Sequence, residues 1–242
     1  MTEAAAQLQK GLDYLALLPD GRERQRQELE LWSALAAVVL ALKGYAAQET
    51  GHAYVRAREL WEQLGSPSEF LHVPYGQSYY HTYRSEFDLA LPLGEDLLRM
   101  SRKRNDSAGL VLGHVASGRS LLFVGRLALS RSHMEQGLAI YNPISHRSFV
   151  HQFGIDPQAI LQSFLGLVLF CLGYPEQASA RARAAIADAR AAAHPPTLCG
   201  ALSFGFIRLS FTGDVALDPT FRTPMMHYLR ATNEWQGYQP GP

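Results

Sequence analysis

Side chains able to bind an anion concentrate in one stretch of this sequence, residues 146–157. Arg147 presents a planar fork of N–H donors that matches a carboxylate or a phosphate. His146 and His151 add donors that titrate near neutral pH. The sequence therefore predicts a ligand-binding loop here.

The same stretch also has a structural interpretation, which the sequence favours. Asp156 precedes Pro157, and an aspartate at that position caps the helix that follows it. A pair between Asp156 and Arg147 would then fix the loop. Both interpretations stay open at the level of sequence.

A second candidate site is aromatic and lies between residues 75 and 83. Tyrosines spaced by three and four share a helix face, and their flat rings and hydroxyls suit a peptide or a small ligand. The predicted groove residues are Tyr79, Tyr80 and Tyr83, with core packing as the equal alternative; Tyr75, beside Pro74, is a weaker candidate. Arg119 is predicted to project into the same groove, the alternative being a solvated surface charge.

Other polar and aromatic groups have structural interpretations. The basic cluster of Arg99, Arg102, Lys103 and Arg104 falls in the last turn of a predicted helix, where exposed carbonyls favour cations. Trp32 and Trp61 are expected to pack between helices. The two cysteines, Cys171 and Cys199, have no partner at metal-binding spacing and are expected to be buried.

No catalytic signature is present in the sequence. It contains no Gly-x-x-x-x-Gly-Lys-Ser/Thr loop, no Gly-x-Ser-x-Gly elbow, no His-Glu-x-x-His and no cluster of cysteines and histidines. We therefore expect neither enzymatic activity, nor a catalytic residue, nor a metal, nor a cofactor.

Composition narrows the class of partner. The 242 residues carry 22 basic and 22 acidic side chains, so no net charge attracts nucleic acid. The longest apolar stretches, 31–42 and 164–172, are too short to span a bilayer, and the first residues lack the pattern of a secretory signal. A cytoplasmic protein that binds neither nucleic acid nor membrane is the expectation.

The elements that must position these residues follow a regular period. A small residue after a large apolar or aromatic stretch recurs at positions 44, 85, 125, 173 and 213, in steps of 41, 40, 48 and 40. Steps of this length are typical of paired helices stacked as a solenoid. The one long step contains an inserted loop, residues 142–157.

Apolar spacing and breaking residues predict where the helices lie. They are expected at residues 3–18, 23–42, 48–64, 68–84, 87–103, 108–124, 128–141, 158–172 and 175–193, with one more ending near Phe211. Pro74 and Gly76 should shorten or kink the helix that contains them. Residues 1–242 are expected to form one helical-repeat domain with an irregular tail, residues 214–242.

Two segments, residues 123–141 and 171–187, resemble tetratricopeptide repeats. In that pattern a glycine and small side chains let the two helices of a repeat meet closely. The resemblance implies an all-α fold, a right-handed solenoid of antiparallel helix pairs.

More narrowly, nearly the whole chain resembles the C-terminal repeat region of bacterial multidomain signalling ATPases, which carry a nucleotide cyclase or a DNA-binding domain. The matching phrases are 43–46, 57–60, 135–141, 146–148 and 172–175. Phe153 and Gln158 depart from the usual loop of that family. Because the ATPase and cyclase motifs are absent here, the resemblance implies a sensor or regulatory arm without those activities.

These observations predict a non-catalytic scaffold that binds a protein or a peptide. The alternative is a domain that binds a small-molecule effector in a pocket at the 142–157 loop. Self-association is a further expectation, because the end of a repeat array exposes an apolar face.

Overall fold

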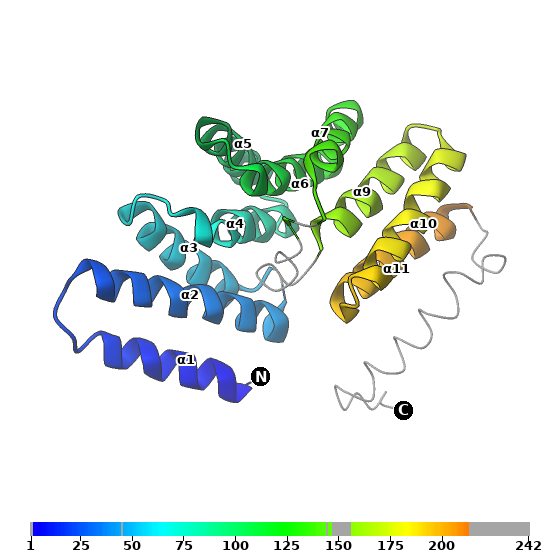
Figure 1. The fold of residues 1–242 in the computed structure, drawn as a ribbon. Coiled ribbons are helices and arrows are strands. Elements are labelled where there is room, and N and C mark those ends of the chain that lie inside the picture. Colours follow the sequence, from blue (N-terminus) through cyan, green and yellow to red (C-terminus); the bar gives the residue numbers. More distant parts are fainter. Residues whose placement is uncertain (1, 45, 144, 147–155, 213–242) are drawn as a thin grey trace, which may run out of the picture. The chain divides into compact units, whose positions relative to one another are not determined.

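The computed structural model describes residues 2–44, 46–143, 145–146 and 156–212. In these ranges the chain is all-helical, with ten α-helices and no strand (Figure 1). The contacts divide the chain into two compact units, residues 1–126 and residues 127–242, and each is described by itself.

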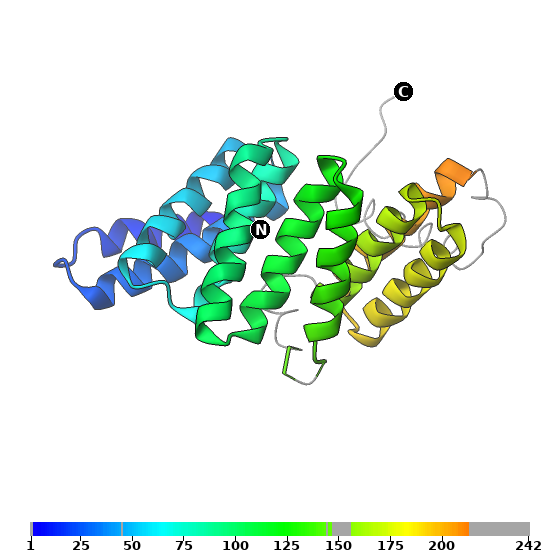
Figure 2. The same cartoon turned by 90° about the horizontal axis from the view of Figure 1, so that it is seen from above.

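The first unit is a succession of neighbouring helices. Each packs against the next along the chain, and α6 also contacts α4. Figures 1 and 2 show this order from blue α1 to green α6. The elements are α1 (Thr2–Leu15), α2 (Arg22–Lys43), α3 (Gln48–Gln63), the 3-10 turn η1 (Ser68–Phe70), α4 (His72–Tyr83), α5 (Phe87–Arg104) and α6 (Ser107–Phe123).

The second unit is arranged around α9 (Pro157–Cys171), which contacts α7 (Leu127–Ile140), α10 (Pro175–Ala191) and α11 (Pro195–Thr212). Alanines dominate the side of α10 that faces its neighbours, so α10 can approach them closely. The buried cluster there consists of Ala159, Ala182, Ala185, Ile186, Ala189, Ala201 and Leu202.

The recurring small residue marks the end of a helix. Ser85, Gly125 and Gly173 have positive φ angles of 61°, 81° and 85°. After α9, for example, Gly173 N–H donates to Phe170 O at 3.0 Å and Tyr174 N–H donates to Leu169 O at 2.9 Å. This pair of bonds is the Schellman motif, which satisfies the last carbonyls of a helix when one residue turns left-handed. The period seen in the sequence is therefore a period of helix ends.

Reciprocal contacts of tyrosine with glycine bring α3 and α4 together. A Cβ atom at Gly51 of α3 would lie 2.3 Å from Tyr80 Cζ of α4. A Cβ atom at Gly76 of α4 would lie 2.2 Å from Tyr54 Cε1 of α3. Each ring occupies the space that the opposite helix leaves by having no side chain, so these helices pack at a distance that only glycine permits.

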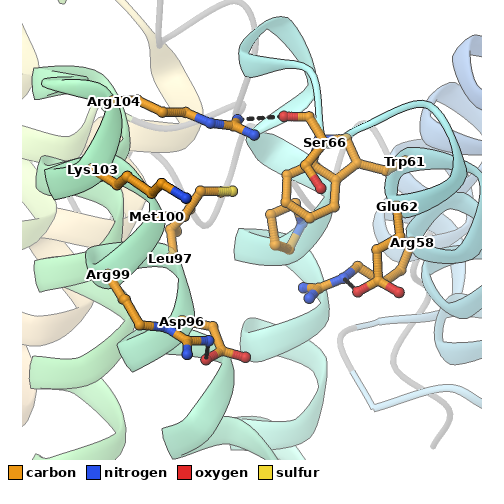
Figure 3. Close-up of a pocket in the computed structure, with 11 residues that line it drawn as sticks. Arg58, Trp61, Glu62, Ser66, Asp96, Leu97, Arg99, Met100, Lys103 and Arg104 are labelled. Atoms are coloured by element: carbon orange, nitrogen blue, oxygen red, sulfur yellow. Dashed lines mark hydrogen bonds and ion pairs between the residues drawn. The ribbon is translucent and has the colours of Figure 1, made fainter.

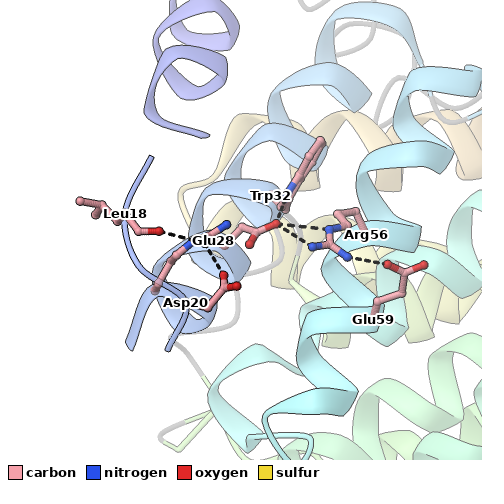
Figure 4. Close-up of polar contacts among 7 residues, drawn as sticks. Leu18, Asp20, Glu28, Trp32, Arg56 and Glu59 are labelled. Carbon is pink, nitrogen blue, oxygen red and sulfur yellow. Dashed lines mark hydrogen bonds and ion pairs between the residues drawn. The ribbon is translucent and has the colours of Figure 1, made fainter. Parts of the chain in front are cut away.

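Charged side chains join α2 to α3 at the surface (Figure 4). Glu28 of α2 accepts hydrogen bonds from Arg56 Nε and Nη2 at 3.2 and 3.0 Å, and from Trp32 Nε1 at 3.3 Å. Arg56 also pairs with Glu59 at 2.8 Å, and that hydrogen bond is the largest of the interactions that raise the pKa of Arg56. The network fixes how the two helices are rotated relative to each other.

The predicted helices are found with small shifts at their ends. The largest difference concerns residues 68–84, where the turn Ser68–Phe70 precedes a helix that starts only at His72. Pro74 then falls in the first turn, where a missing N–H costs little. α5 continues unbroken through Pro92. The expectation that both cysteines are buried is wrong: Cys171 is exposed, at the last residue of its helix, and Cys199 is half-buried.

Some expectations fall on residues outside the described ranges: most of the inserted loop (residues 147–155), Gly213 and the tail. The expectation of one domain spanning residues 1–242 stays a prediction. None of the helices in the described part of the chain is long and apolar enough to cross a membrane.

Candidate functional site

Helix α4 carries three tyrosines on one face. Tyr75, Tyr79 and Tyr83 are spaced by four residues, and we call them the tyrosine row. Their ring centroids are 6.1 Å apart for Tyr75 and Tyr79 and 4.8 Å apart for Tyr79 and Tyr83. The hydroxyls of Tyr79 and Tyr83 are 3.3 Å apart. A spacing of four on a helix produces this continuous aromatic strip.

Helix α6 faces the tyrosine row with two residues that are also four apart. The Arg119 guanidinium carbon lies 3.8 Å from the Tyr79 ring centroid and 5.4 Å from that of Tyr75. The Phe123 ring lies 6.2 Å from the Tyr83 ring. Since both series run in the same direction along the chain, α4 and α6 are parallel at this contact.

Hydroxyl groups set the close approach of α4 and α6. Thr82 Oγ1 and Ser120 Oγ are 2.9 Å apart, and each also lies within hydrogen-bond distance of the carbonyl four residues earlier in its own helix, at 2.8 and 3.0 Å. Because each hydroxyl has one proton, one of the two donates to the other and the second donates to its helix carbonyl. Asp106 caps α6 by accepting from Gly109 N–H at 3.1 Å. The contact between Thr82 and Ser120 holds α4 and α6 together one residue beyond Arg119.

Arg119 is completely buried, so the alternative of a solvated surface charge is wrong. Its Nη1 donates to the Tyr75 hydroxyl at 3.4 Å. Among the described residues, Nε and Nη2 make no hydrogen bond, and no carboxylate lies within ion-pair distance. The charge is held by two aromatic faces and one hydroxyl.

Exposure is lowest in the middle of this face, because Tyr75 on one side of Tyr79 is half-buried and Tyr83 on the other side is exposed. Arg119 is 0% exposed and Tyr79 is 8% exposed, whereas Tyr83 and Phe123 are 37% and 47% exposed. The aromatic strip thus leads from solvent to a buried cation.

Tyr80 does not belong to the tyrosine row. It is buried with Ala36, Ala53 and Tyr54, in the contact over Gly51 described above. One residue corresponds to a rotation of about 100° around a helix, so Tyr80 points to a different side of α4 from Tyr79. The structure assigns Tyr80 to helix packing and brings Tyr75, the weaker candidate by sequence, next to Arg119.

Of the three candidate residues in the inserted loop, the structure describes His146. It is buried, its ring centroid lies 5.5 Å from that of Tyr141, and its Nδ1 accepts from Asn142 N–H at 3.1 Å. These contacts fold the chain back on itself after α7. Arg147 and His151 lie outside the described residues.

Asp156 caps α9, as the structural interpretation predicted. Its Oδ1 accepts from Gln158 N–H at 2.8 Å and from the Tyr141 hydroxyl at 3.2 Å. The Asp156 N–H donates to Thr197 Oγ1 of α11 at 2.9 Å. The capping half of that interpretation is confirmed; the pair with Arg147 lies outside the described residues.

The first unit also contains a pocket of about 520 Å³ that spacing alone did not predict (Figure 3). We call it the basic pocket. It lies between the C-terminal ends of α3 and α5 and the start of α4. Its lining consists of Arg58, Trp61, Glu62, Ser66, Pro74, Asp96, Leu97, Arg99, Met100, Lys103 and Arg104.

The cations of the basic pocket are only partly neutralised. Arg58 pairs with Glu62 at 2.6 Å, and Arg99 pairs with Asp96 at 2.5 Å. Arg104 donates to the carbonyls of Ser66 and Gly65 and so ties down the turn after α3 (Figure 3). In the described part of the chain, neither Lys103 nor Arg104 has a carboxylate within ion-pair distance. The pocket therefore carries two unmatched positive charges.

The last turn of α5 contains Arg102, Lys103 and Arg104, as the structural interpretation of the basic cluster predicted, whereas Arg99 lies one turn earlier and pairs with Asp96. Sequence reasoning missed that Arg58 and Trp61, about forty residues earlier, line the same pocket. In the described ranges, no group of three or more histidine, cysteine, aspartate and glutamate side chains is placed to hold a metal ion.

Comparison with known proteins shows the fold. No protein-family model matches the chain, and no curated protein matches it either. Among solved structures it is similar to BtubC (BKLC) from P. vanneervenii, with a TM-score of 0.64 over 100% of this chain and 94% of that one. The sequences are 12% identical, so this likeness shows a shared helical fold and nothing about function.

Proposed function

We propose that this chain is a non-catalytic interaction module built from tetratricopeptide-like repeats in a right-handed superhelix. The support is the recurrence of left-handed helix ends at Ser85, Gly125 and Gly173, and the packing of each helix against the next within a unit. The helical likeness to BtubC is consistent with such a repeat fold. The resemblance to signalling ATPases adds the proposal of a cytoplasmic sensor arm in a bacterial signalling system.

The partner is a protein or a peptide that binds the face formed by α4 and α6. One observation carries this proposal: the tyrosine row and Phe123 form an aromatic strip that is exposed at Tyr83 and Phe123 and that contacts a buried arginine through Tyr79 and Tyr75. Tyrosine and arginine are the residue types that most often dominate binding interfaces. The rings of tyrosines offer a large contact area to a partner at a low cost in side-chain entropy.

Selection from a displayed random-peptide library on the intact protein tests this proposal. We expect the selected peptides to lose about tenfold in affinity or more on Tyr83→Ala and on Phe123→Ala, which is a loss typical of an interface residue. Tyr14→Ala is the matched control, because Tyr14 is 71% exposed on α1, away from this face. Selection without binders, or equal affinity for all three variants, would contradict the proposal.

An alternative function, binding of a small-molecule effector, is favoured by a separate observation. The basic pocket has room for a small ligand and carries the unmatched charges of Lys103 and Arg104. If this alternative holds, citrate or a nucleotide should raise the Tm of the protein, and Lys103→Gln should remove that shift. Lys10→Gln, an exposed lysine of α1, is the control. The alternative would be excluded if the selected peptides bind at the α4/α6 face and neither citrate nor a nucleotide changes the Tm.

A further inference from the structure

We propose that Arg119 binds a carboxylate group of the ligand. The inference rests on the proposed function and deepens it, because it names the chemical group that the α4/α6 face recognises. It depends on three observations. Arg119 is buried, one of its nitrogens donates a hydrogen bond to Tyr75, and two of its nitrogens donate none among the described residues.

Burial makes an unmatched guanidinium unusual. An arginine side chain stays protonated in a protein, and a buried charge is costly unless it is paired. Around Arg119 the described residues supply the rings of Tyr75 and Tyr79 and one hydroxyl, but no negative charge. Aromatic faces attract a cation, yet they accept no strong hydrogen bond from its N–H groups. The site is therefore electrostatically incomplete.

The unused donors have a specific geometry. Nη1 is the nitrogen bonded to Tyr75, whereas Nε and Nη2 make no hydrogen bond among the described residues. These two nitrogens form one edge of the guanidinium, and their N–H bonds are parallel to each other. That edge matches two oxygens of one oxyanion, which is the strongest form of arginine recognition.

The charge balance selects a carboxylate from the possible oxyanions. Arg119 contributes one positive charge, and a carboxylate contributes one negative charge. A phosphate dianion would leave one charge unmatched in a buried site, at a high cost in free energy. The aromatic strip of Tyr79, Tyr83 and Phe123 suits a carboxylate that is attached to a flat or apolar group.

Access to the site follows from the exposure of the strip. Arg119 has no exposed surface, so a ligand reaches it only when a neighbouring side chain moves. Tyr83, 37% exposed, is the most exposed member of the tyrosine row. Its neighbour Phe123 is 47% exposed. The carboxylate enters from this end.

Calorimetric titration of the full chain tests the proposal with three probes: benzoate, its neutral analogue benzamide, and inorganic phosphate. We expect benzoate to bind about tenfold tighter than benzamide or phosphate, as a charge-assisted pair requires. Arg119→Lys keeps the charge but removes the fork, and it should weaken benzoate by about tenfold. Arg183→Lys, at an exposed arginine of α10, should leave benzoate binding unchanged.

If Arg119→Lys fails to fold, two measurements still test the proposal: the comparison of benzoate with benzamide on the wild-type protein, and benzoate binding by Tyr83→Ala. Tyr83→Ala changes an exposed ring and should weaken benzoate without loss of helicity. Equal and measurable binding of benzoate and benzamide, or full benzoate affinity in a folded Arg119→Lys protein, would overturn the proposal.

Peptide variants distinguish the two sources of a carboxylate. Selected peptides are compared as acids and as amides, at the C-terminus and at each aspartate or glutamate. If one amide replacement removes binding, the carboxylate belongs to a peptide; if benzoate binds and no peptide does, it belongs to a small acid. Peptides that bind equally well as amides, with benzoate inactive, would refute the carboxylate site and leave the proposed function standing.

Discussion

Residues with a left-handed backbone conformation at the helix ends show how a single position affects the stability of this protein. Gly173 after α9 has φ 85°, and Ala193 after α10 has φ 50°. An L-residue pays about 1–2 kcal/mol in this region, which glycine largely avoids. A Cβ atom at Gly173 would meet nothing within 4 Å, so the backbone alone decides the effect of a substitution there.

Opposite substitutions at these two positions should have opposite effects. We expect Gly173→Ala to lower the free energy of unfolding by about 1 kcal/mol and Ala193→Gly to raise it by about 0.5–1 kcal/mol. Urea denaturation followed by far-UV circular dichroism measures both. Changes of the same sign would show that side-chain contacts, rather than φ, control these turns.

The stability of the first unit depends on pH through His72. Burial lowers the pKa of His72 from 6.5 to about 4. In the unfolded chain the imidazole takes up a proton near pH 6.5, whereas in the folded chain it does so only near pH 4. The stability that the neutral side chain contributes is therefore complete above pH 6.5 and is lost as the pH falls toward 4.

Replacement of His72 by a residue that does not titrate should flatten this dependence. We expect the free energy of unfolding of the wild type to fall by up to about 3 kcal/mol more than that of His72→Leu between pH 6.5 and pH 4. The slope of stability against pH is the measurement, since the variant's absolute stability also reflects altered packing. If the free energy of unfolding changes with pH equally in the two proteins, His72 is not the source of the pH dependence.

At the scale of helices, close packing through glycine decides which substitutions are tolerated. Gly51 and Gly200 both lie within helices. A Cβ atom at Gly51 would lie 2.3 Å from the Tyr80 ring, whereas a Cβ atom at Gly200 would lie 3.9 Å from Ile160 Cδ1, the nearest atom among the described residues. The same change to alanine therefore meets a clash at Gly51 and an ordinary van der Waals contact at Gly200.

Alanine should destabilise the protein at Gly51 and stabilise it at Gly200. Overpacking of α3 against α4 is expected to cost about 1–3 kcal/mol at Gly51. At Gly200 the gain in helix propensity is expected to be about 0.5–1 kcal/mol. Thermal and urea unfolding of both variants measure the difference, and a destabilised Gly200→Ala would show that helix propensity does not control that position.

Helices were predictable from the sequence because apolar spacing and helix-ending residues are local signals. The face on which Tyr80 lies was also readable in principle, since Tyr75, Tyr79 and Tyr83 repeat every four residues and Tyr80 does not. The sequence indicated the burial of Arg119 less clearly. Helix α6 contains many small residues, among them Gly113, Ala116 and Ser120, and these allow neighbouring helices to pack closely on several sides.

The basic pocket could not be predicted from the sequence, because it depends on where two helix ends meet. Trp61 and Lys103 are 42 positions apart, and no spacing rule joins them. Only the packing of α3, α4 and α5 brings them to one cavity. Sequence analysis did place Arg119 in the groove of the tyrosines, but its pairing with Tyr75 in particular depends on α4 and α6 running parallel.

At the scale of the whole molecule, each unit has an interior of its own. Buried residues of the second unit cluster around α9, α10 and α11, and the glycine–tyrosine contacts of the first unit join α3 to α4. In arrays of stacked helices, stability is a sum of local contributions and contacts between neighbours. A destabilising change should therefore act mainly on the unit that contains it.

Tryptophan fluorescence can report on the first unit separately. Trp32 and Trp61 both lie there, and Trp235, outside the described residues, is removed by Trp235→Phe. In that background, we expect Gly51→Ala to shift the urea midpoints of both fluorescence and circular dichroism. Gly173→Ala, in the second unit, should shift the circular dichroism and leave the fluorescence midpoint nearly unchanged, because its effect is local. If both variants move both signals equally, the two units unfold as one cooperative structure, and binding at the α4/α6 face would then stabilise the second unit as much as the first.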